Sequence, residues 1–162
     1  MLVEMDNLPT LDDVYQKFGF ASEAAQLLET ELGTLIFGEQ AFAEELIGGD
    51  GKRATEIMNA VNRQTLGALI KNAKGSSKSI EQIATLLEVA LKERNRLSHS
   101  FYRQHNFRRN SGEGRAVMLQ DLETIHTVIL EAYKQLMLLG GTDLDAATEG
   151  QFTLPKTHVK II

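Results

Sequence analysis

The sequence predicts an all-α fold, an antiparallel bundle of four to five helices followed by a poorly structured C-terminal tail. Strand-like alternation of apolar and polar residues is almost absent, whereas apolar residues recur at helical spacing. The two prolines, Pro9 and Pro155, bracket the body of the chain and do not interrupt it. Short connections between helical segments favour antiparallel neighbours. We therefore expect the bundle to span residues 10–140 and the tail to span residues 141–162.

The first helical segment begins directly after Pro9. Thr10 suits the N-cap position, and Asp12 and Asp13 suit the positive end of the helix dipole. The glycine-rich run IGGDGK, residues 47–52, breaks the pattern and ends the segment. The apolar residues that set the helical period are Leu11, Val14, Tyr15, Phe18, Ala24, Leu27, Leu28, Leu35, Phe42 and Leu46.

Two further helical segments follow in the middle of the chain. ATEIMNAVNRQTLGALIKNA, residues 54–73, reads as one helical region that ends at KGSS, residues 74–77. Ser79 is followed three residues later by Gln82, which is the form of a capping box. We expect this box to open the third main helix.

A loop at NSGEG, residues 110–114, precedes the last predicted helix. The run LGGT, residues 139–142, stops that helix, and the residues beyond it have little periodicity. Within the predicted tail, HVKII, residues 158–162, suggests a short extended end. The apolar residues of the last helix are Val117, Met118, Leu122, Ile125, Val128, Ile129, Tyr133, Leu136 and Met137.

Length and composition fit one domain without disulfides. The chain has 162 residues, 43% of them apolar, and single cores typically comprise about 100–200 residues. No cysteine is present, which excludes disulfides, thiolate nucleophiles and cysteine-ligated zinc. The start MLVEMDNLPT lacks the pattern of a secretory signal, and no run of about 18 apolar residues occurs. We expect a cytoplasmic protein with no membrane segment.

The charge is distributed unevenly. The formal net charge is −5, yet the segment from Lys92 to Arg115 holds seven basic and two acidic residues, a balance of +5. The remaining residues therefore carry −10. An acidic body with one basic stripe can direct a phosphate-bearing ligand to a single place, whereas the simpler interpretation is a solvated helix end and loop.

The third main helix contains an anomaly at Arg94. On a helical wheel Arg94 lies near the middle of an apolar sector, with Ser98 beside it. Asn95 and His99 are four residues apart and stack on the edge of that sector, with Tyr102 one turn beyond. The apolar members of the sector are Ile80, Ile83, Ala84, Leu87, Ala90, Leu91, Leu97 and Phe101.

Two interpretations of Arg94 remain open at this stage. Burying an unpaired guanidinium costs several kcal/mol, so Arg94 must either pair with an acid or line a cleft. Candidate acids are Asp121 on the next helix and Glu93 of another copy of the chain. In a cleft, Arg94 could bind phosphate bidentately, and His99 could exchange a proton near neutral pH.

The residues RNRLSH, Arg94 to His99, match the R-N-x-x-x-H motif of HEPN-domain proteins, which are helical bundles that include many RNA-cleaving toxins and defence effectors. The wider run ERNRLSHSFYRQHNFRRNSGEGRAVMLQDLE resembles a group of uncharacterised bacterial proteins with this motif. The likeness of the bundle pattern covers residues 10–140.

The resemblance implies a homodimer in which arginine and histidine face a shared cleft and assist metal-free attack of a ribose 2′-hydroxyl on its phosphate. Arg94 would hold the phosphate, and His99 would be the general acid or base. Asn95 would orient the histidine or bind substrate. HEPN toxins controlled by nucleotidyltransferase antitoxins commonly carry H-x-Y, but Phe101 stands at the tyrosine position here, so we assign no antitoxin partner.

Additional RNA contacts are expected from FYRQHNFRR, residues 101–109, because aromatic rings interleaved with arginines can stack unpaired bases and hold phosphates. Phe101 faces the apolar sector and is therefore expected in the core. Phe107 could stack a base, or it could simply anchor the loop. The predicted RNA-binding residues are Arg96, Tyr102, Arg103, Arg108 and Arg109.

We assign no metal and no cofactor. His99 and His105 are six residues apart, and two ligands on one helical face require a spacing of four. His126 is expected to be packed and hydrogen-bonded in the last helix. The resemblance thus implies a HEPN-like RNA-binding protein that acts as a metal-independent endoribonuclease of a toxin or defence system. The alternative is a non-catalytic homodimeric interaction module that docks through the Arg94 seam.

Overall fold

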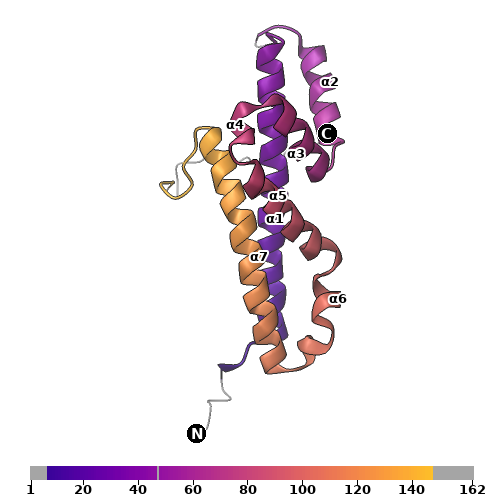
Figure 1. Ribbon diagram of the computed structural model, residues 1–162, viewed down its shortest axis with the longest axis vertical. Helices are drawn as coiled ribbons and strands as arrows, with labels where there is room; N and C mark the ends of the chain where they lie inside the picture. The colour runs from indigo at the N-terminus through magenta and orange to yellow at the C-terminus, as the bar shows by residue number, and fades with distance from the viewer. Residues whose placement is uncertain (1–6, 47, 148–162) are drawn as a thin grey trace, which may run out of the picture. The chain divides into compact units, whose positions relative to one another are not determined.

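The computed structural model describes residues 7–46 and 48–147, and every regular element within these ranges is helical (Figure 1). The all-α prediction is confirmed, but four to five helices was too few, because seven α-helices and one 3-10 helix occur in the described ranges. The elements are α1 (Leu11–Ala43), α2 (Gly51–Asn62), α3 (Leu66–Ser76), α4 (Lys78–Glu81), α5 (Ala84–His99), α6 (Phe101–His105), η2 (Asn106–Asn110) and α7 (Gly112–Leu139). None of the described helices is both long and apolar enough to cross a membrane.

The chain divides into two compact units, which are described separately. Unit 1 combines Met1–Leu28 with Thr85–Tyr133, and unit 2 combines Glu29–Ala84 with Lys134–Ile162. Helix α1 contributes its N-terminal half to unit 1 and the remainder to unit 2.

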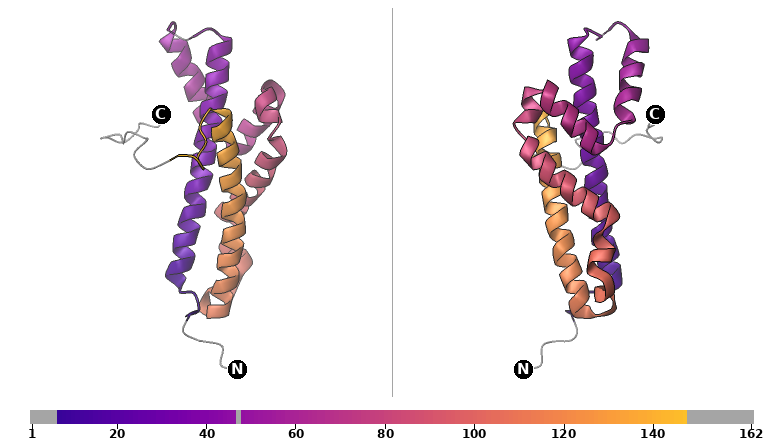
Figure 2. Two further views of the ribbon diagram at one scale, coloured as in Figure 1. Left: turned by 90° about the vertical axis from the view of Figure 1, so that its left-hand side faces the viewer. Right: turned by 45° about the vertical axis from the view of Figure 1, so that its right-hand side comes forward.

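Unit 1 is a bundle in which α1 and α7 run in the same direction and α5 and α6 run against them (Figure 2). The pairing of Pro9 with Arg115 and of Lys17 with Glu123 shows that α1 and α7 are parallel. The core is formed by Val14, Ala21, Ala24, Ala25, Leu28, Leu87, Ala90, Leu97, Phe101, Met118, Leu122, Ile125, Ile129 and Ala132, all of them buried. Full burial of each Leu, Ile, Val or Phe side chain contributes about 1.5–3 kcal/mol.

Unit 2 has its own core, and side-chain caps mark where its helices begin. Asp50 accepts a hydrogen bond from the backbone N–H of Arg53 and begins α2. Thr65 caps α3 in the same way through the N–H of Ala68, so the region predicted as one helix over residues 54–73 is two helices. The core residues are Leu32, Ile57, Val61, Leu66, Leu69, Ile70, Ala73, Ile80, Ala84 and Leu136.

The third predicted helix is likewise divided, and its N-cap is Ser77. The Ser77 hydroxyl accepts from the N–H of Ile80 at 3.2 Å and donates to Glu39 Oε1 of α1 at 2.8 Å. The predicted capping box at Ser79 and Gln82 is therefore wrong, because α4 begins at Lys78 and Gln82 is its C-terminal cap. Ser77 is buried and Ser79 is exposed, so tertiary contact with α1 selected between the two serines.

The loop predicted at residues 110–114 is shorter in the structure, because α7 begins at Gly112. Ser111 accepts a hydrogen bond from the N–H of Gly114 at 3.0 Å and so satisfies a donor at this helix start. A Cβ atom at Gly114 would collide with the backbone of Arg108, so only glycine allows α7 to approach η2 this closely.

The C-terminal end of α7 and the start of the predicted tail are also defined. The N–H of Thr142 bonds to the carbonyl of Met137, and Gly141 adopts a positive φ of 91°. Residues 141–147 form turns, in which Asp143 accepts from the N–H groups of Asp145 and Ala146. The extended end predicted at residues 158–162 lies outside the described residues.

Replacement of Ser77 by alanine is expected to lower the free energy of unfolding by about 1–2 kcal/mol, since it removes an N-cap and the bond to Glu39. The matched replacement Ser79→Ala removes an exposed hydroxyl that caps no helix in the structure, and it should leave stability nearly unchanged. Urea denaturation of both variants measures the difference. Equal losses for the two serines would contradict the assignment of Ser77 as the cap.

Candidate functional site

Arg94 lies on the seam of α5 that faces the core of unit 1. Ala90 and Leu97, one turn before and one turn after it, are both buried. Arg94 itself is half-buried, and its Nη1 donates to the side-chain oxygen of Asn95 at 3.1 Å. Because the carbon stem of an arginine can lie along apolar surface, this position keeps the guanidinium near the edge of the seam.

The other two residues of the motif are exposed at the end of the same helix. Asn95 and His99 are separated by one turn, and α5 ends at His99. The carbonyl of His99 accepts a hydrogen bond from Arg103 Nη2 at 3.0 Å, which ties the helix end to α6. The structure thus holds Arg94, Asn95 and His99 within the last turns of α5, with the imidazole accessible to solvent.

Arg96 occupies a different environment from Arg94, although the sequence analysis placed both in the basic stripe. It bonds to Asp121 on α7 through two N–H groups, at 2.6 and 2.7 Å. Two further N–H groups bond to Glu93, and the last bonds to Gln104 at 3.2 Å. All five donors of this guanidinium are used within unit 1, so we do not count Arg96 among the groups that can bind RNA.

Asp121 was expected as a possible partner of Arg94, but its partner is Arg96. The Arg96 guanidinium, with help from His105, holds the pKa of the Asp121 carboxyl below its usual range. Hydrogen bonds to Asp121 and to Glu93 in turn raise the pKa of Arg96. Asp121 is therefore an ionised acceptor that joins α5 to α7 in a two-pronged salt bridge.

His105 is a second histidine of the site, and the sequence analysis gave it no role beyond excluding a metal. Its ring is 5% exposed and packs against Phe101, with ring centroids 4.5 Å apart. Its Nε2 lies 2.6 Å from Asp121 Oδ2, and its Nδ1 lies 3.1 Å from Arg108 Nη1. The available signal was its spacing of four residues from Phe101, which places both side chains on one face of a helix.

Aromatic rings and an arginine meet on the surface of unit 1, in what we call the aromatic–arginine patch, made of Tyr15, Phe18, Tyr102 and Arg109. Arg109 Nη2 donates to the hydroxyl of Tyr15 at 3.0 Å. The rings of Phe18 and Tyr102 have centroids 5.2 Å apart, and Tyr102 is 40% exposed. Burial raises the pKa of Tyr102, Tyr15 adds to this rise and Arg109 opposes it, so the groups act on each other electrostatically.

Tyr15 was not among the predicted site residues. The sequence placed it only in the apolar period of the first helix. Its contact partner Arg109 is 94 positions later in the chain, and helical spacing carries no information about such a distant contact.

The segment after α6 has a strained backbone that sets the direction of the next side chains. Asn106 has φ 49° and ψ −120°, a conformation that typically costs a residue with a side chain about 1–3 kcal/mol. Phe107, which follows it, is 76% exposed, and Arg108 and Arg109 come next in η2. Close contact of Gly114 with the Arg108 backbone holds this segment against α7.

His126 has the packed, hydrogen-bonded environment that was expected from its position in the last helix. Its Nδ1 accepts from Lys17 Nζ at 3.1 Å, and the same ammonium forms an ion pair with Glu123. Burial and the Lys17 charge lower the pKa of His126.

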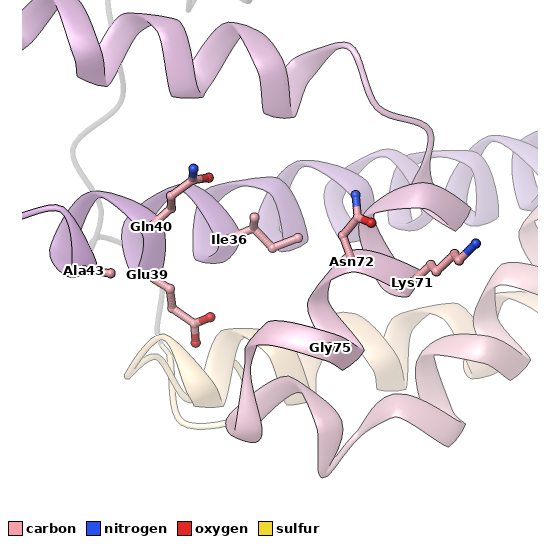
Figure 3. Close-up of a pocket in the computed structure, with 7 residues that line it drawn as sticks. All are labelled: Ile36, Glu39, Gln40, Ala43, Lys71, Asn72 and Gly75. Carbon is pink, nitrogen blue, oxygen red and sulfur yellow. The ribbon is translucent and has the colours of Figure 1, made fainter.

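Unit 2 contains an open cavity of about 680 Å³ between α1 and α3 (Figure 3). Its walls are Ile36, Glu39, Gln40, Ala43, Lys71, Asn72 and Gly75. The Glu39 carboxylate is held there by the hydroxyl of Ser77. None of the residues predicted from the sequence as site residues lines this cavity.

Comparison of the chain with protein-family models, with curated proteins and with solved structures finds no match. Among the residues that the structure describes, no group of three or more His, Cys, Asp or Glu side chains is placed to hold a metal ion.

Replacement of Asp121 by asparagine is expected to destabilise unit 1, because it leaves Arg96 with an unmatched donor pair. We expect a loss on the order of 2 kcal/mol at neutral pH, below the ~3–5 kcal/mol of a fully buried pair because Asp121 is partly solvated. The folded-state pKa of Asp121 is depressed, so its contribution is present above the ordinary value of 3.8 and is lost as pH falls through the lower folded value.

Urea denaturation of wild type and Asp121→Asn from pH 7 to pH 2 measures both effects. The difference between the two proteins should shrink as pH falls below about 4. Asp12→Asn, which changes an exposed carboxylate of α1, is the matched control and should have a smaller effect. A difference that stays constant down to pH 2 would contradict an ionic role for Asp121.

Proposed function

We propose that this chain is a HEPN-like RNA-binding protein that acts as a metal-independent endoribonuclease of a toxin or defence system. Arg94, Asn95 and His99 form its reacting centre, and the aromatic–arginine patch binds the RNA strand. Two copies of the chain are proposed to pair so that the reacting centre faces a shared cleft.

The observation that carries this proposal is the division of the arginines of unit 1 between internal and surface roles. Arg96 uses its five donors on side chains of its own unit. Arg109 instead lies at the surface and uses one Nη on the exposed Tyr15, beside the exposed ring of Tyr102. Exposed rings beside a guanidinium suit unpaired bases and their phosphates, which favours a single-stranded ligand.

The reaction follows from the groups at the end of α5. His99, as a neutral base, takes the proton of a ribose 2′-hydroxyl, and the 2′-oxygen then forms a bond to the adjacent phosphorus. The bond from phosphorus to the 5′-oxygen breaks, and that oxygen takes a proton from an imidazolium or from water. The products are a 2′,3′-cyclic phosphate and a free 5′-hydroxyl.

Arg94 and Asn95 would support this step without exchanging a proton. The guanidinium of Arg94 presents paired donors to the phosphate oxygens, on which negative charge increases as the 2′-oxygen attacks. Asn95 holds Arg94 through its side-chain oxygen, and it stands one turn from His99. It can therefore orient either neighbour.

A second candidate function is supported by the position of Arg94. A half-buried arginine between the buried Ala90 and Leu97 can fix the register of two paired helices without any chemistry. In that case the chain is a non-catalytic module that docks through the Arg94 seam.

Incubation of the protein with mixed single-stranded RNA in EDTA tests the catalytic proposal. Wild type should yield fragments that end in cyclic phosphate, and His99→Ala should reduce the rate by roughly 10²–10⁴-fold, the usual contribution of a general acid or base. His126→Gln, which changes a histidine of the same unit outside the motif, should retain the rate. Thermal melting establishes that both variants are folded.

The outcomes of this experiment separate the two candidate functions. If wild type leaves RNA intact at high protein concentration, and Arg94→Ala abolishes self-association in light scattering, the docking module replaces the ribonuclease. If His99→Ala cleaves as fast as wild type, the assignment of His99 is wrong.

The aromatic–arginine patch is tested by RNA binding with cleavage disabled through His99→Ala. Tyr102→Leu should weaken binding by about 1–3 kcal/mol, the usual contribution of one base-stacking ring. Arg109→Gln should reduce the slope of log K against log salt by about 0.7, as expected for one lost phosphate contact to a single strand. Arg63→Gln, an exposed arginine of unit 2, is the matched control, and equal losses for it and Arg109→Gln would contradict the patch.

A further inference from the structure

The His105 ring is held between two side chains of opposite hydrogen-bonding character. Asp121 Oδ2 lies 2.6 Å from Nε2, and Arg108 Nη1 lies 3.1 Å from Nδ1. The ring is 5% exposed and packs against Phe101, so it cannot turn over without disturbing the core. Both ring nitrogens therefore have fixed partners.

The partner on the Nε2 side can only accept a hydrogen bond. Asp121 receives two N–H groups of Arg96, which keep its carboxyl ionised and lower its pKa. An ionised carboxylate has no proton to donate. The proton of this short contact therefore belongs to Nε2 of His105.

The partner on the Nδ1 side can only donate. A guanidinium carries five N–H donors and no acceptor, so Arg108 Nη1 must donate to a lone pair on Nδ1. With its proton on Nε2 and a lone pair on Nδ1, the His105 ring is neutral in this arrangement.

We propose that His105 is a positioning residue for Arg108, and that uptake of a second proton at Nδ1 releases the Arg108 guanidinium from the ring. A protonated Nδ1 of His105 turns an N–H donor toward the N–H donor of Arg108. It also places the imidazolium charge beside the guanidinium charge. The charged groups around the ring come from three elements: Asp121 from α7, Arg96 and Glu93 of α5 behind that carboxylate, and Arg108 from η2. Asp121 keeps the protonated ring in place, so Arg108 is the group that moves.

The backbone around Arg108 confines this change to its side chain. Gly114 lies against the Arg108 backbone so closely that a Cβ atom would not fit between them. The carbonyl of Arg108 also accepts from the N–H of Ser111. Loss of the bond to His105 therefore frees the Nη1 group of Arg108 while its peptide stays against α7.

The consequence for RNA rests on the function proposed above. Arg108 is exposed and stands between Phe107 and Arg109 in η2, so the Nη1 group that leaves His105 joins a guanidinium that already faces solvent. It can then bind one additional phosphate of a single strand, so acidification should recruit one more phosphate contact. By linkage, bound RNA should in turn favour the protonated ring.

The tautomer and its titration can be read without RNA by long-range ¹H–¹⁵N correlation NMR of the full chain. At alkaline pH His105 should show a protonated Nε2 and an unprotonated Nδ1. Arg108→Gln removes the cation that opposes the second proton, so the titration midpoint of His105 should move to higher pH. The midpoint of His126, whose Nδ1 instead faces Lys17, should not move and serves as the matched control.

Binding measurements then test the consequence for RNA, in a His99→Gln background so that the motif histidine does not titrate. As pH falls through the His105 midpoint, the slope of log K against log salt should steepen by about 0.7, one phosphate of a single strand. Arg108→Gln should lose this step, whereas Arg109→Gln should keep it.

The two measurements fail separately. A proton on Nδ1 at alkaline pH, or a His105 midpoint that does not respond to Arg108→Gln, overturns the positioning role whatever the RNA result. The expected NMR result with no RNA binding at any pH leaves the positioning of Arg108 established and overturns the proposed RNA function. The expected NMR result with RNA binding but no pH-dependent step overturns the additional phosphate contact alone.

Discussion

The salt bridge between Arg96 and Asp121 determines how α5 presents its two faces in unit 1. Because Arg96 of α5 bonds to Asp121 of α7 through two N–H groups, rotation of α5 about its axis would break this partly buried salt bridge. Arg94 is two residues earlier, which places it about 160° around the helix from Arg96. The pair therefore fixes the orientation of the R-N-x-x-x-H motif without belonging to it.

Helical periodicity predicted where the chain is helical, but not where its helices end. The glycines of residues 47–52 indicated a break between the first two helices, but α1 ends earlier, at Ala43, and α2 already begins at Gly51. The start of α3 depends on one hydroxyl, that of Thr65, and the choice of Ser77 over Ser79 depends on contact with Glu39 of α1. In the sequence Ser79 with Gln82 fits a capping box and Ser77 with Ile80 does not, so the local pattern favoured the serine that caps no helix. Tertiary contact decided between them.

The candidate site shows the same division between local and long-range information. The wheel placed Arg94 on the apolar seam of α5 and identified Asp121 as an acid that could reach that helix, yet the structure pairs Asp121 with Arg96. A helical wheel gives the direction of a side chain around its own helix axis. It gives neither the position along the axes at which two helices meet nor the rotation of one helix relative to the other. Tyr15 and His105 were overlooked because their partners lie on other elements.

The basic stripe has two physical effects that its net charge alone does not separate. Every arginine in it adds to the long-range field, whether or not its N–H groups are occupied, because hydrogen bonding leaves the charge in place. Contact with a phosphate requires donors that still point outward, which Arg96 does not retain. Arg96 therefore adds to the positive field around the stripe without offering free N–H groups to a phosphate.

A chain of hydrogen-bonded side chains leads from the core of unit 1 to the surface at Arg108, and its members differ in whether they donate or accept. Glu93 and Asp121 accept, Arg96 and Arg108 donate, and His105 both donates and accepts. The carboxylates and guanidiniums each have one state near neutral pH, so they can transmit a change of geometry but cannot start one. Of these five groups, only the imidazole can change its charge in that range while it remains bonded to Asp121. Within this group of side chains, a proton taken up by the His105 ring, as proposed above, would be passed to the surface as a movement of the Arg108 side chain.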